Sequence, residues 1–140
     1  MGKFNNSVIS WSLKANKRTE EIHQEVATEG FRILKRRSPV KSGRFRANWR
    51  VGLNSPDLTA DDSFTTSQYG DEPNQNEMKE ARRVIRKAKV KDKILLTNAL
   101  PYAKNIERGD SKMAPHGVIE LSHLELKAIY PAIAARLTRR

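Results

Sequence analysis

The residues best suited to chemistry are two histidines and a carboxylate in the C-terminal part of the chain. His116, Glu120 and His123 are spaced four and three residues apart, so on a helix they share one face. Two imidazoles and a carboxylate form a ligand set that zinc accepts. The spacing matches neither HExxH nor another zinc signature, and only His23 remains as a further histidine. We therefore favour a structural or surface role, with a metal-dependent enzyme as the weakest alternative.

Other catalytic patterns are missing from the sequence. There is no nucleophile-elbow motif for a hydrolytic triad, and the seven glycines are scattered rather than gathered in a phosphate-binding loop. The chain has no cysteine, which excludes disulfides and thiolate metal sites. The acidic residues that could form a carboxylate pair cluster in a polar stretch. The sequence therefore predicts no enzymatic activity, no cofactor and no metal.

Charge is distributed along the chain in blocks. The chain has 27 basic and 16 acidic residues, an excess that favours contact with nucleic acid or an acidic protein surface. A first basic run, residues 32–50, holds eight Lys or Arg and no acidic residue. Residues 54–77 hold six acidic residues and no basic one, and a second basic run, residues 79–93, holds eight basic residues against two acidic. This alternation suits self-assembly through complementary faces, although a solvated charged surface explains each run equally well.

The first long element is predicted to be an amphipathic helix. It starts near residues 8–11 and runs to about Arg37, or else starts later with Thr19 as its cap. Pro39 ends it, because proline disfavours helical geometry in the residue before it, and Gly43 supplies the positive φ of a tight turn. Its apolar stripe has spacings of three and four residues and consists of Ile22, Val26, Ala27, Gly30, Ile33 and Leu34.

Residues 44–53 are predicted to form a strand with one basic face. Apolar Phe45, Ala47, Trp49 and Val51 alternate with Arg44, Arg46, Asn48 and Arg50. The apolar face should join the core, and the three arginines should face a partner or solvent. A nucleic-acid stacking platform is the alternative, but the alternation places Phe45 and Trp49 opposite the arginines, which favours the core.

Residues 54–76 are predicted to form an extended acidic loop or hairpin excursion. The segment is too long for an ordinary connection, so it is either ordered by an assembly or a mobile surface loop. Phe64 and Tyr69 are the large apolar residues that could anchor it. A helix over 77–89 follows, capped by Asn76, with a basic face that could also lie along a phosphate backbone.

The last third of the chain is predicted to hold a short buried strand at 93–98, a helical turn at 102–107 and a helix at 118–137. Pro131 should kink or break that helix near Ile129-Tyr130. The predicted fold class is α+β, a small antiparallel sheet packed by a long N-terminal helix and a C-terminal helix. Residues 1–140 should form one domain with a flexible arm at 1–10, without a signal peptide or transmembrane helix.

Three motifs together resemble a known family. The first, Ser38-Pro39-Val40-Lys41-Ser42-Gly43-Arg44-Phe45-Arg46-Ala47-Asn48-Trp49, follows the long helix. The second is Asn98 to Ala103 with Glu107-Arg108-Gly109, and the third is Ala114-Pro115-His116-Gly117. In order and spacing they resemble the neck or tail-completion proteins of long-tailed bacteriophages. The family often has an acidic residue in place of Lys41 and a small residue in place of Asp110.

The resemblance implies a non-enzymatic virion component. Such proteins form a ring at the head–tail junction, between the connector and the tail terminator or tail tube, after assembly in the host cytoplasm. Genome DNA passes through the ring without sequence-specific binding, and no membrane is involved. The rival prediction is a small basic nucleic-acid-binding protein that uses the strand arginines and the helix at 77–89.

Eight residues are structural or interface candidates on this interpretation. A ring needs two different complementary surfaces, and the acidic segment of one subunit could dock on either basic run of its neighbour. Residues shaping the turn and its packing, together with those facing a neighbour, are Arg44, Arg46, Trp49, Arg50, Asp61, Asp62, Tyr102 and Glu107.

Overall fold

The computed structural model describes residues 8–15, 19–61 and 68–139 as an arrangement of three strands and five helices. The elements in chain order are β1 (Ile9–Leu13), α1 (Glu20–Arg37), α2 (Arg44–Ala47), β2 (Trp49–Leu53), α3 (Gln75–Ile85), β3 (Ile94–Asn98), α4 (Ala103–Glu107) and α5 (Ile119–Thr138). The predicted α+β class, with a small antiparallel sheet and long N-terminal and C-terminal helices, is confirmed.

The sheet has the strand order β1-β3-β2, with both pairs antiparallel. In the middle of the register, Leu96 of β3 lies between Trp11 of β1 and Val51 of β2. Residues 9–13 alternate between buried and exposed positions, which is the pattern of a strand with one face on the core. The prediction of a helix starting near residues 8–11 was therefore wrong. Of the predicted arm at 1–10, residues 9 and 10 belong to β1 and residues 1–7 lie outside the described residues.

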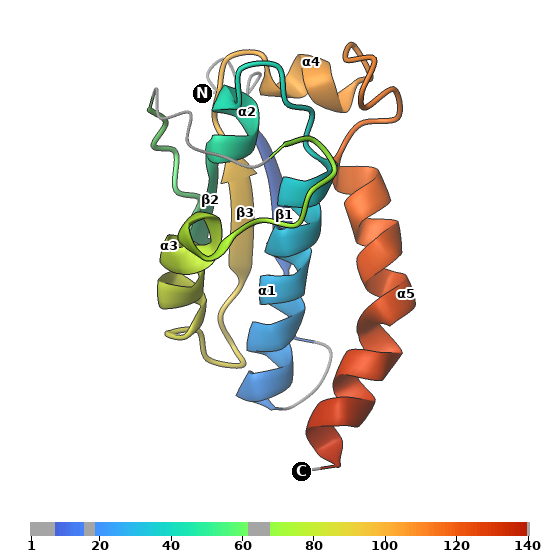
Figure 1. Ribbon diagram of the computed structural model, residues 1–140. Helices are drawn as coiled ribbons and strands as arrows, with labels where there is room; N and C mark the ends of the chain where they lie inside the picture. Colours follow the sequence, from blue (N-terminus) through green and yellow to red (C-terminus); the bar gives the residue numbers. More distant parts are fainter. Residues whose placement is uncertain (1–7, 16–18, 62–67, 140) are drawn as a thin grey trace.

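The helix α1 starts at the later of the two predicted positions. Thr19 is its N-cap, and its side-chain oxygen accepts a hydrogen bond from Ile22 N over 3.3 Å. The helix ends at Arg37, immediately before Ser38 and Pro39, as predicted. It lies across the sheet, with α3 on one side and α5 on the other (Figure 1). The main hydrophobic core lies between α1 and the sheet.

The helix α3 has a capping box two residues earlier than the predicted cap. Asn74 Oδ1 accepts from Glu77 N over 2.9 Å, and Glu77 Oε1 accepts from Asn74 N over 3.1 Å. The helix ends at Ile85 rather than near residue 89. β3 and α4 fall where a strand and a helical turn were predicted, and α5 continues through Pro131 without the predicted break.

The described parts of the acidic loop, residues 54–61 and 68–74, contain no helix or strand. Tyr69 is 47% exposed, and its hydroxyl donates to Met113 O over 2.8 Å, so it contacts the turn before α5. Phe64, the other predicted anchor, lies outside the described residues. No helix in the described ranges is long and apolar enough to cross a membrane.

Candidate functional site

The turn after α1 is held by its own side chains. Gly43 has a φ of 92°, a value that its missing Cβ permits, and α2 begins directly after it. Trp49 Nε1 donates to Ser38 Oγ over 2.7 Å, and Ser38 Oγ donates to Leu34 O over 2.7 Å. The rings of Phe45 and Trp49 meet edge to face with centroids 5.7 Å apart. Both aromatic side chains are buried, as predicted.

Arg46 is fully buried, which corrects the prediction of an exposed arginine face. Its Nε donates to Glu77 Oε2 over 3.1 Å, its Nη1 to Gln68 O over 2.8 Å, and its Nη2 to Asp71 O over 2.8 Å. The reason for the correction is that residues 44–47 are helical, so their side chains do not alternate between two faces. The charge of Arg46 is therefore used inside the fold, where it connects α2 to α3.

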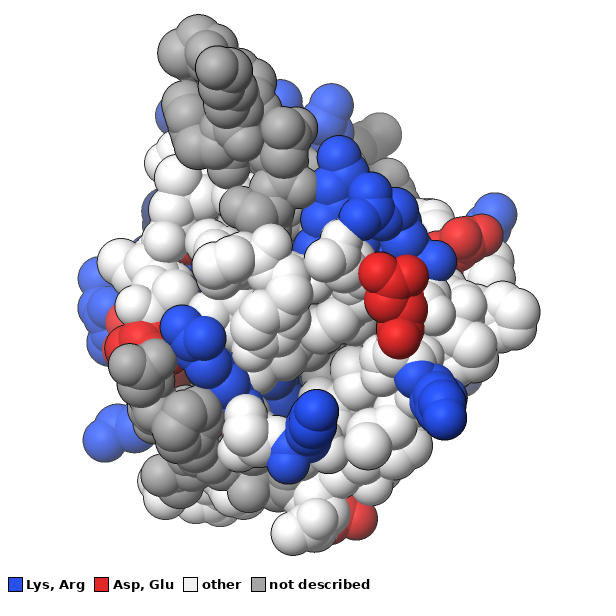
Figure 2. Space-filling view, turned by 90° about the horizontal axis from the view of Figure 1, so that it is seen from above, with Lys and Arg blue, Asp and Glu red and all other residues white. Residues whose placement is uncertain are grey.

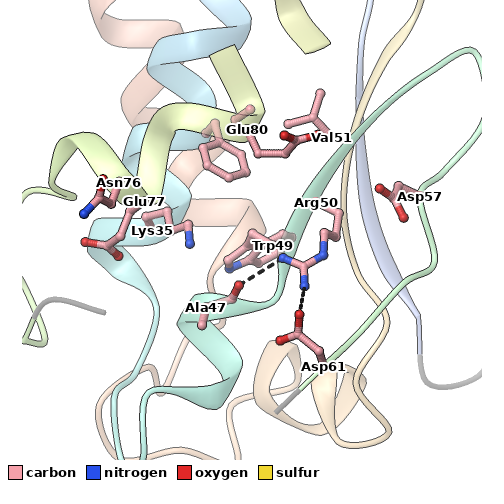
Figure 3. Close-up of a pocket in the computed structure, with 12 residues that line it drawn as sticks. Lys35, Ala47, Trp49, Arg50, Val51, Asp57, Asp61, Asn76, Glu77 and Glu80 are labelled. Carbon is pink, nitrogen blue, oxygen red and sulfur yellow. Dashed lines mark hydrogen bonds and ion pairs between the residues drawn. The ribbon is translucent and has the colours of Figure 1, made fainter. Parts of the chain in front are cut away.

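Arg50 and Asp61 lie together near the surface, beside the turn. Arg50 Nη2 lies 3.3 Å from Asp61 Oδ2 (Figure 3). The Asn48 side chain pairs with the Asp61 backbone: its Nδ2 donates to Asp61 O over 2.9 Å, and its Oδ1 accepts from Asp61 N over 2.9 Å. Asp61 thus holds the start of the acidic loop against β2. Asp62, the other acidic candidate, lies outside the described residues.

The first basic run is not an exposed cationic surface. Of its eight Lys and Arg, only Lys41 is exposed. Arg36 and Arg37 pair with Glu125 of α5, and the Arg37 Nε to Glu125 Oε1 distance is 2.8 Å. Arg44 is partly buried on α2. Most of this run therefore joins elements of the same chain.

The second basic run has the opposite character, because all of its eight basic residues are exposed. They follow the outer face of α3 and the connection to β3. The set consists of Lys79, Arg82, Arg83, Arg86, Lys87, Lys89, Lys91 and Lys93. Arg83 pairs with Glu80, and Lys89 Nζ lies 3.9 Å from Glu20 Oε1.

The second motif contacts the first through Asn98 and Tyr102. Asn98 Nδ2 donates to Phe45 O over 2.9 Å, and Asn98 Oδ1 accepts from Leu100 N over 3.2 Å. Tyr102 is half-buried, and its ring centroid lies 6.5 Å from that of Phe45. Asn98 is fully buried, and its bond to Phe45 O fixes the position of α2 relative to the end of β3.

Glu107 holds the second and third motifs together by capping α5. Its Oε1 accepts from Val118 N over 2.8 Å and from Ile119 N over 2.9 Å. A carboxylate at a helix N-terminus satisfies free N–H groups and interacts favourably with the helix dipole. Gly117 has a φ of 82°, and a Cβ there would lie 2.4 Å from Glu107 O. The glycine is therefore required for the close approach that the cap needs.

The first and second motifs meet at one end of the molecule around a groove of about 470 Å³. Phe45, Tyr102 and Ile106 supply apolar lining, and Lys41 and Lys112 are exposed beside them. Figure 2 views this end, where a largely uncharged centre is bordered by both Lys or Arg and Asp or Glu side chains. A groove of this composition can receive an apolar side chain of a partner.

The histidines and the carboxylate considered for zinc do not form a metal site. His116, Glu120 and His123 are all exposed. The His123 ring contacts the Trp11 ring edge to face, with the ring centroids 5.8 Å apart. The described residues contain no group of three His, Cys, Asp or Glu placed to hold a metal ion. His23 is buried, and its Nε2 donates to Asp92 O over 2.8 Å, a structural contact.

Lys35 is the residue that the sequence analysis missed. It is only 3% exposed, and its Nζ lies 5.5 Å from the centroid of the Phe31 ring. Burial lowers the pKa of Lys35 to about 8; Glu77 opposes this shift, and two neighbouring arginines reinforce it. The signal was present in the sequence, since Lys35 follows Phe31 by four residues and so shares its buried face of α1.

Comparison with protein-family models, with curated proteins and with solved structures finds no match to this chain.

Proposed function

We propose that this chain is a structural, non-enzymatic protein of a tailed-phage virion that forms an oligomeric ring at the head–tail junction. It would link the connector to the tail terminator or tail tube and let genome DNA pass. The observation that carries the proposal is the meeting of all three motifs in one unit. Asn98 binds Phe45 O of the first motif, and Glu107 binds Val118 N, the residue directly after the third motif. Motif residues used in this way support a scaffold rather than a catalyst.

The ring would close through two different surfaces of each subunit. One is the start of the acidic loop, where Leu58 is 46% exposed between Asp57 and Asp61. The other is the second basic run, because the first has few exposed charges left. Complementary charge on the two surfaces favours one relative orientation of neighbouring subunits and speeds their association.

The mass of the purified protein tests ring formation directly. Light scattering and native mass spectrometry, with and without the neighbouring virion proteins, should give a closed oligomer of fixed size in at least one mixture. A monomer that persists in every mixture would refute the ring.

Charge reversal tests which surface is used. Arg86→Glu with Lys87→Glu should weaken assembly, most strongly at low salt, because both side chains are exposed and have no ion pair within the described residues. Reversing Asp61 and Asp62 should act in the same direction. Lys127→Glu on α5 is the matched control, as an exposed lysine outside both surfaces. Equal oligomer mass in all variants would exclude this docking mode.

A second candidate function is nucleic-acid binding, favoured by the eight exposed cations of the second basic run. These side chains could neutralise successive phosphates of a duplex. Affinity would then fall with salt concentration with a slope of about −0.9 per phosphate neutralised. A duplex titration across salt concentrations separates the candidates, because a structural ring subunit should show weak binding and a shallow slope.

A further inference from the structure

A buried ammonium group without an anionic partner lies next to a cavity in this fold. Lys35 extends from α1 between Glu77 and Trp49 (Figure 3). Its Nζ has the contact with the Phe31 ring, but within the described residues it makes no hydrogen bond and no ion pair. A buried charge is costly unless it is paired, so this one is suited to a ligand that supplies the missing anion.

The acidic groups closest to Lys35 already have partners. Glu77 pairs with Arg46 Nε at 3.1 Å, and Asp61 lies 3.3 Å from Arg50 Nη2. Two further carboxylates line the cavity. Asp57 accepts from Thr59 N and Oγ1 over 3.0 and 2.7 Å, and Glu80 pairs with Arg83. Glu77 raises the pKa of Lys35 but is paired with Arg46, so within the described residues the Lys35 ammonium has no ion-pair partner of its own.

The cavity beside Lys35 has a volume of about 260 Å³ and a mixed lining. Apolar surface comes from Phe31, Trp49, Val51 and Ala81. Asp57, Asp61 and Glu80 also line it, and their side chains come from the acidic loop and α3 (Figure 3). A lining that combines apolar side chains with fixed polar groups can bind a small molecule or a side chain.

We propose that this cavity binds a carboxylate carried on an apolar body, with the carboxylate paired with Lys35 Nζ. The apolar walls would cover the body of the ligand, and the one ammonium of Lys35 matches a single negative charge. The carboxylates of Asp57, Asp61 and Glu80 disfavour more highly charged anions such as phosphate. The carboxylate can come from a free monocarboxylic acid or from a Glu side chain of another protein.

The proposal has a pH dependence of known sign. The charged groups facing Lys35 are Arg46, Arg50, Glu77, Glu80, Asp57 and Asp61. The pKa of Lys35 is lowered by burial to about 8. The ligand pairs with the ammonium form, so its affinity should be constant below that pH and fall about tenfold per pH unit above it. Binding should also raise the pKa of Lys35, because an opposite charge favours the charged form.

NMR of protein labelled with ¹³C at the lysine Cε atoms provides the test. The probe is 3-phenylpropanoate, and the neutral analogue is 3-phenylpropanamide. One lysine resonance, assigned by its loss in Lys35→Met, should shift in a saturable way with the acid. The amide should bind at least about tenfold more weakly, because it leaves the ammonium unpaired. Equal binding of acid and amide would overturn the proposal.

Two variants and two peptides complete the experiment. Lys35→Met should abolish the acid's binding, whereas Lys41→Met, which removes an exposed lysine, should leave it unchanged. The capped peptides Ac-Phe-Glu-NH2 and Ac-Phe-Gln-NH2 distinguish the source of the carboxylate. Shifts with the Glu peptide alone support a protein side chain, and shifts with phenylpropanoate alone support a free acid. No saturable shift with either ligand overturns the proposal, whatever the oligomeric state of the protein.

Discussion

The two basic runs have the same number of Lys and Arg but opposite positions in the fold. In the first run one of eight cations is exposed, and in the second all eight are exposed. The first run covers the buried face of α1 and the α2 turn, where distant carboxylates reach its side chains. The second covers the outer face of α3. Charge density along a sequence therefore does not distinguish cations that hold a fold from cations offered to a partner.

Removing Arg46 from the first run should have the largest effect. Arg46→Met removes the ion pair between Arg46 and the buried Glu77 carboxylate and the donors to Gln68 O and Asp71 O. Breaking a buried, hydrogen-bonded ion pair costs about 3–5 kcal/mol. Urea unfolding followed by circular dichroism should show a loss of that size in the free energy of unfolding.

The matched control is an arginine of the second run. Arg82 is exposed and forms no ion pair within the described residues, so Arg82→Met should change the free energy of unfolding by less than about 0.5 kcal/mol. If the two arginine variants lost equal stability, the contrast between the runs would be wrong.

Removing the buried ammonium of Lys35 should raise the free energy of unfolding, whereas removing Arg46 should lower it. Its pKa of about 8 lies below the ordinary value of 10.5, so the folded state holds the charge at a cost. A depression of this size corresponds to about 3 kcal/mol at neutral pH. Lys35→Met should therefore raise the free energy of unfolding by up to about 3 kcal/mol at pH 7. A variant less stable than the parent would contradict an uncompensated charge.

The same variant should change how stability depends on pH. Between pH 8 and 10.5 the unfolded state binds more protons at Lys35 than the folded state does. The free energy of unfolding of the parent therefore rises with pH across this window. Below the window, the cost of burying the Lys35 charge is present in full. In Lys35→Met this rise should be missing, so the difference between variant and parent should shrink toward pH 10.5. Denaturant titrations at four pH values measure it.

Glu77 connects the two buried cations, and changing it should have an intermediate effect. Glu77→Gln keeps an oxygen acceptor near Arg46 Nε but removes the compensating charge. The expected loss is about 2 kcal/mol, because a hydrogen bond to a charged group is weakened and the Arg46 charge stays buried. The pKa of Lys35 should fall further, since Glu77 raises it. Lysine NMR titration detects this second effect, and an unchanged pKa would exclude the coupling.

The fold class could be predicted from the sequence because the apolar spacing of a long helix such as α1 is also its buried face in the folded protein. The helix α1 was predicted from the spacing of its apolar stripe, and the strand β3 from a short apolar run. The strand β1 was missed because five alternating residues next to a helix pattern give a weak signal. Residues 44–47 alternate basic and apolar side chains, which predicts a strand. In the structure the positive φ of Gly43 turns the chain at this point, and these residues form the helix α2.

The contacts of the candidate site depend on pairs that are distant in the sequence. The acceptors of Arg46 lie at positions 68, 71 and 77, and the N–H groups capped by Glu107 come after a long turn. No local pattern specifies either set, although the family resemblance marked both residues. Lys35 is different, because its place on the buried face of α1 is visible in the spacing from Phe31.

The smallest effect on stability is expected from the second basic run. Arg86→Gln with Lys87→Gln removes two exposed charges that have no ion pair within the described residues, so the free energy of unfolding should change by less than about 0.5 kcal/mol. Association should nevertheless weaken, because exposed charges act on encounter with a partner rather than on folding. Unfolding and light scattering on the same samples across salt concentrations measure both quantities. A large stability loss, or association unchanged at low salt, would mean that these cations are used within the subunit as those of the first run are.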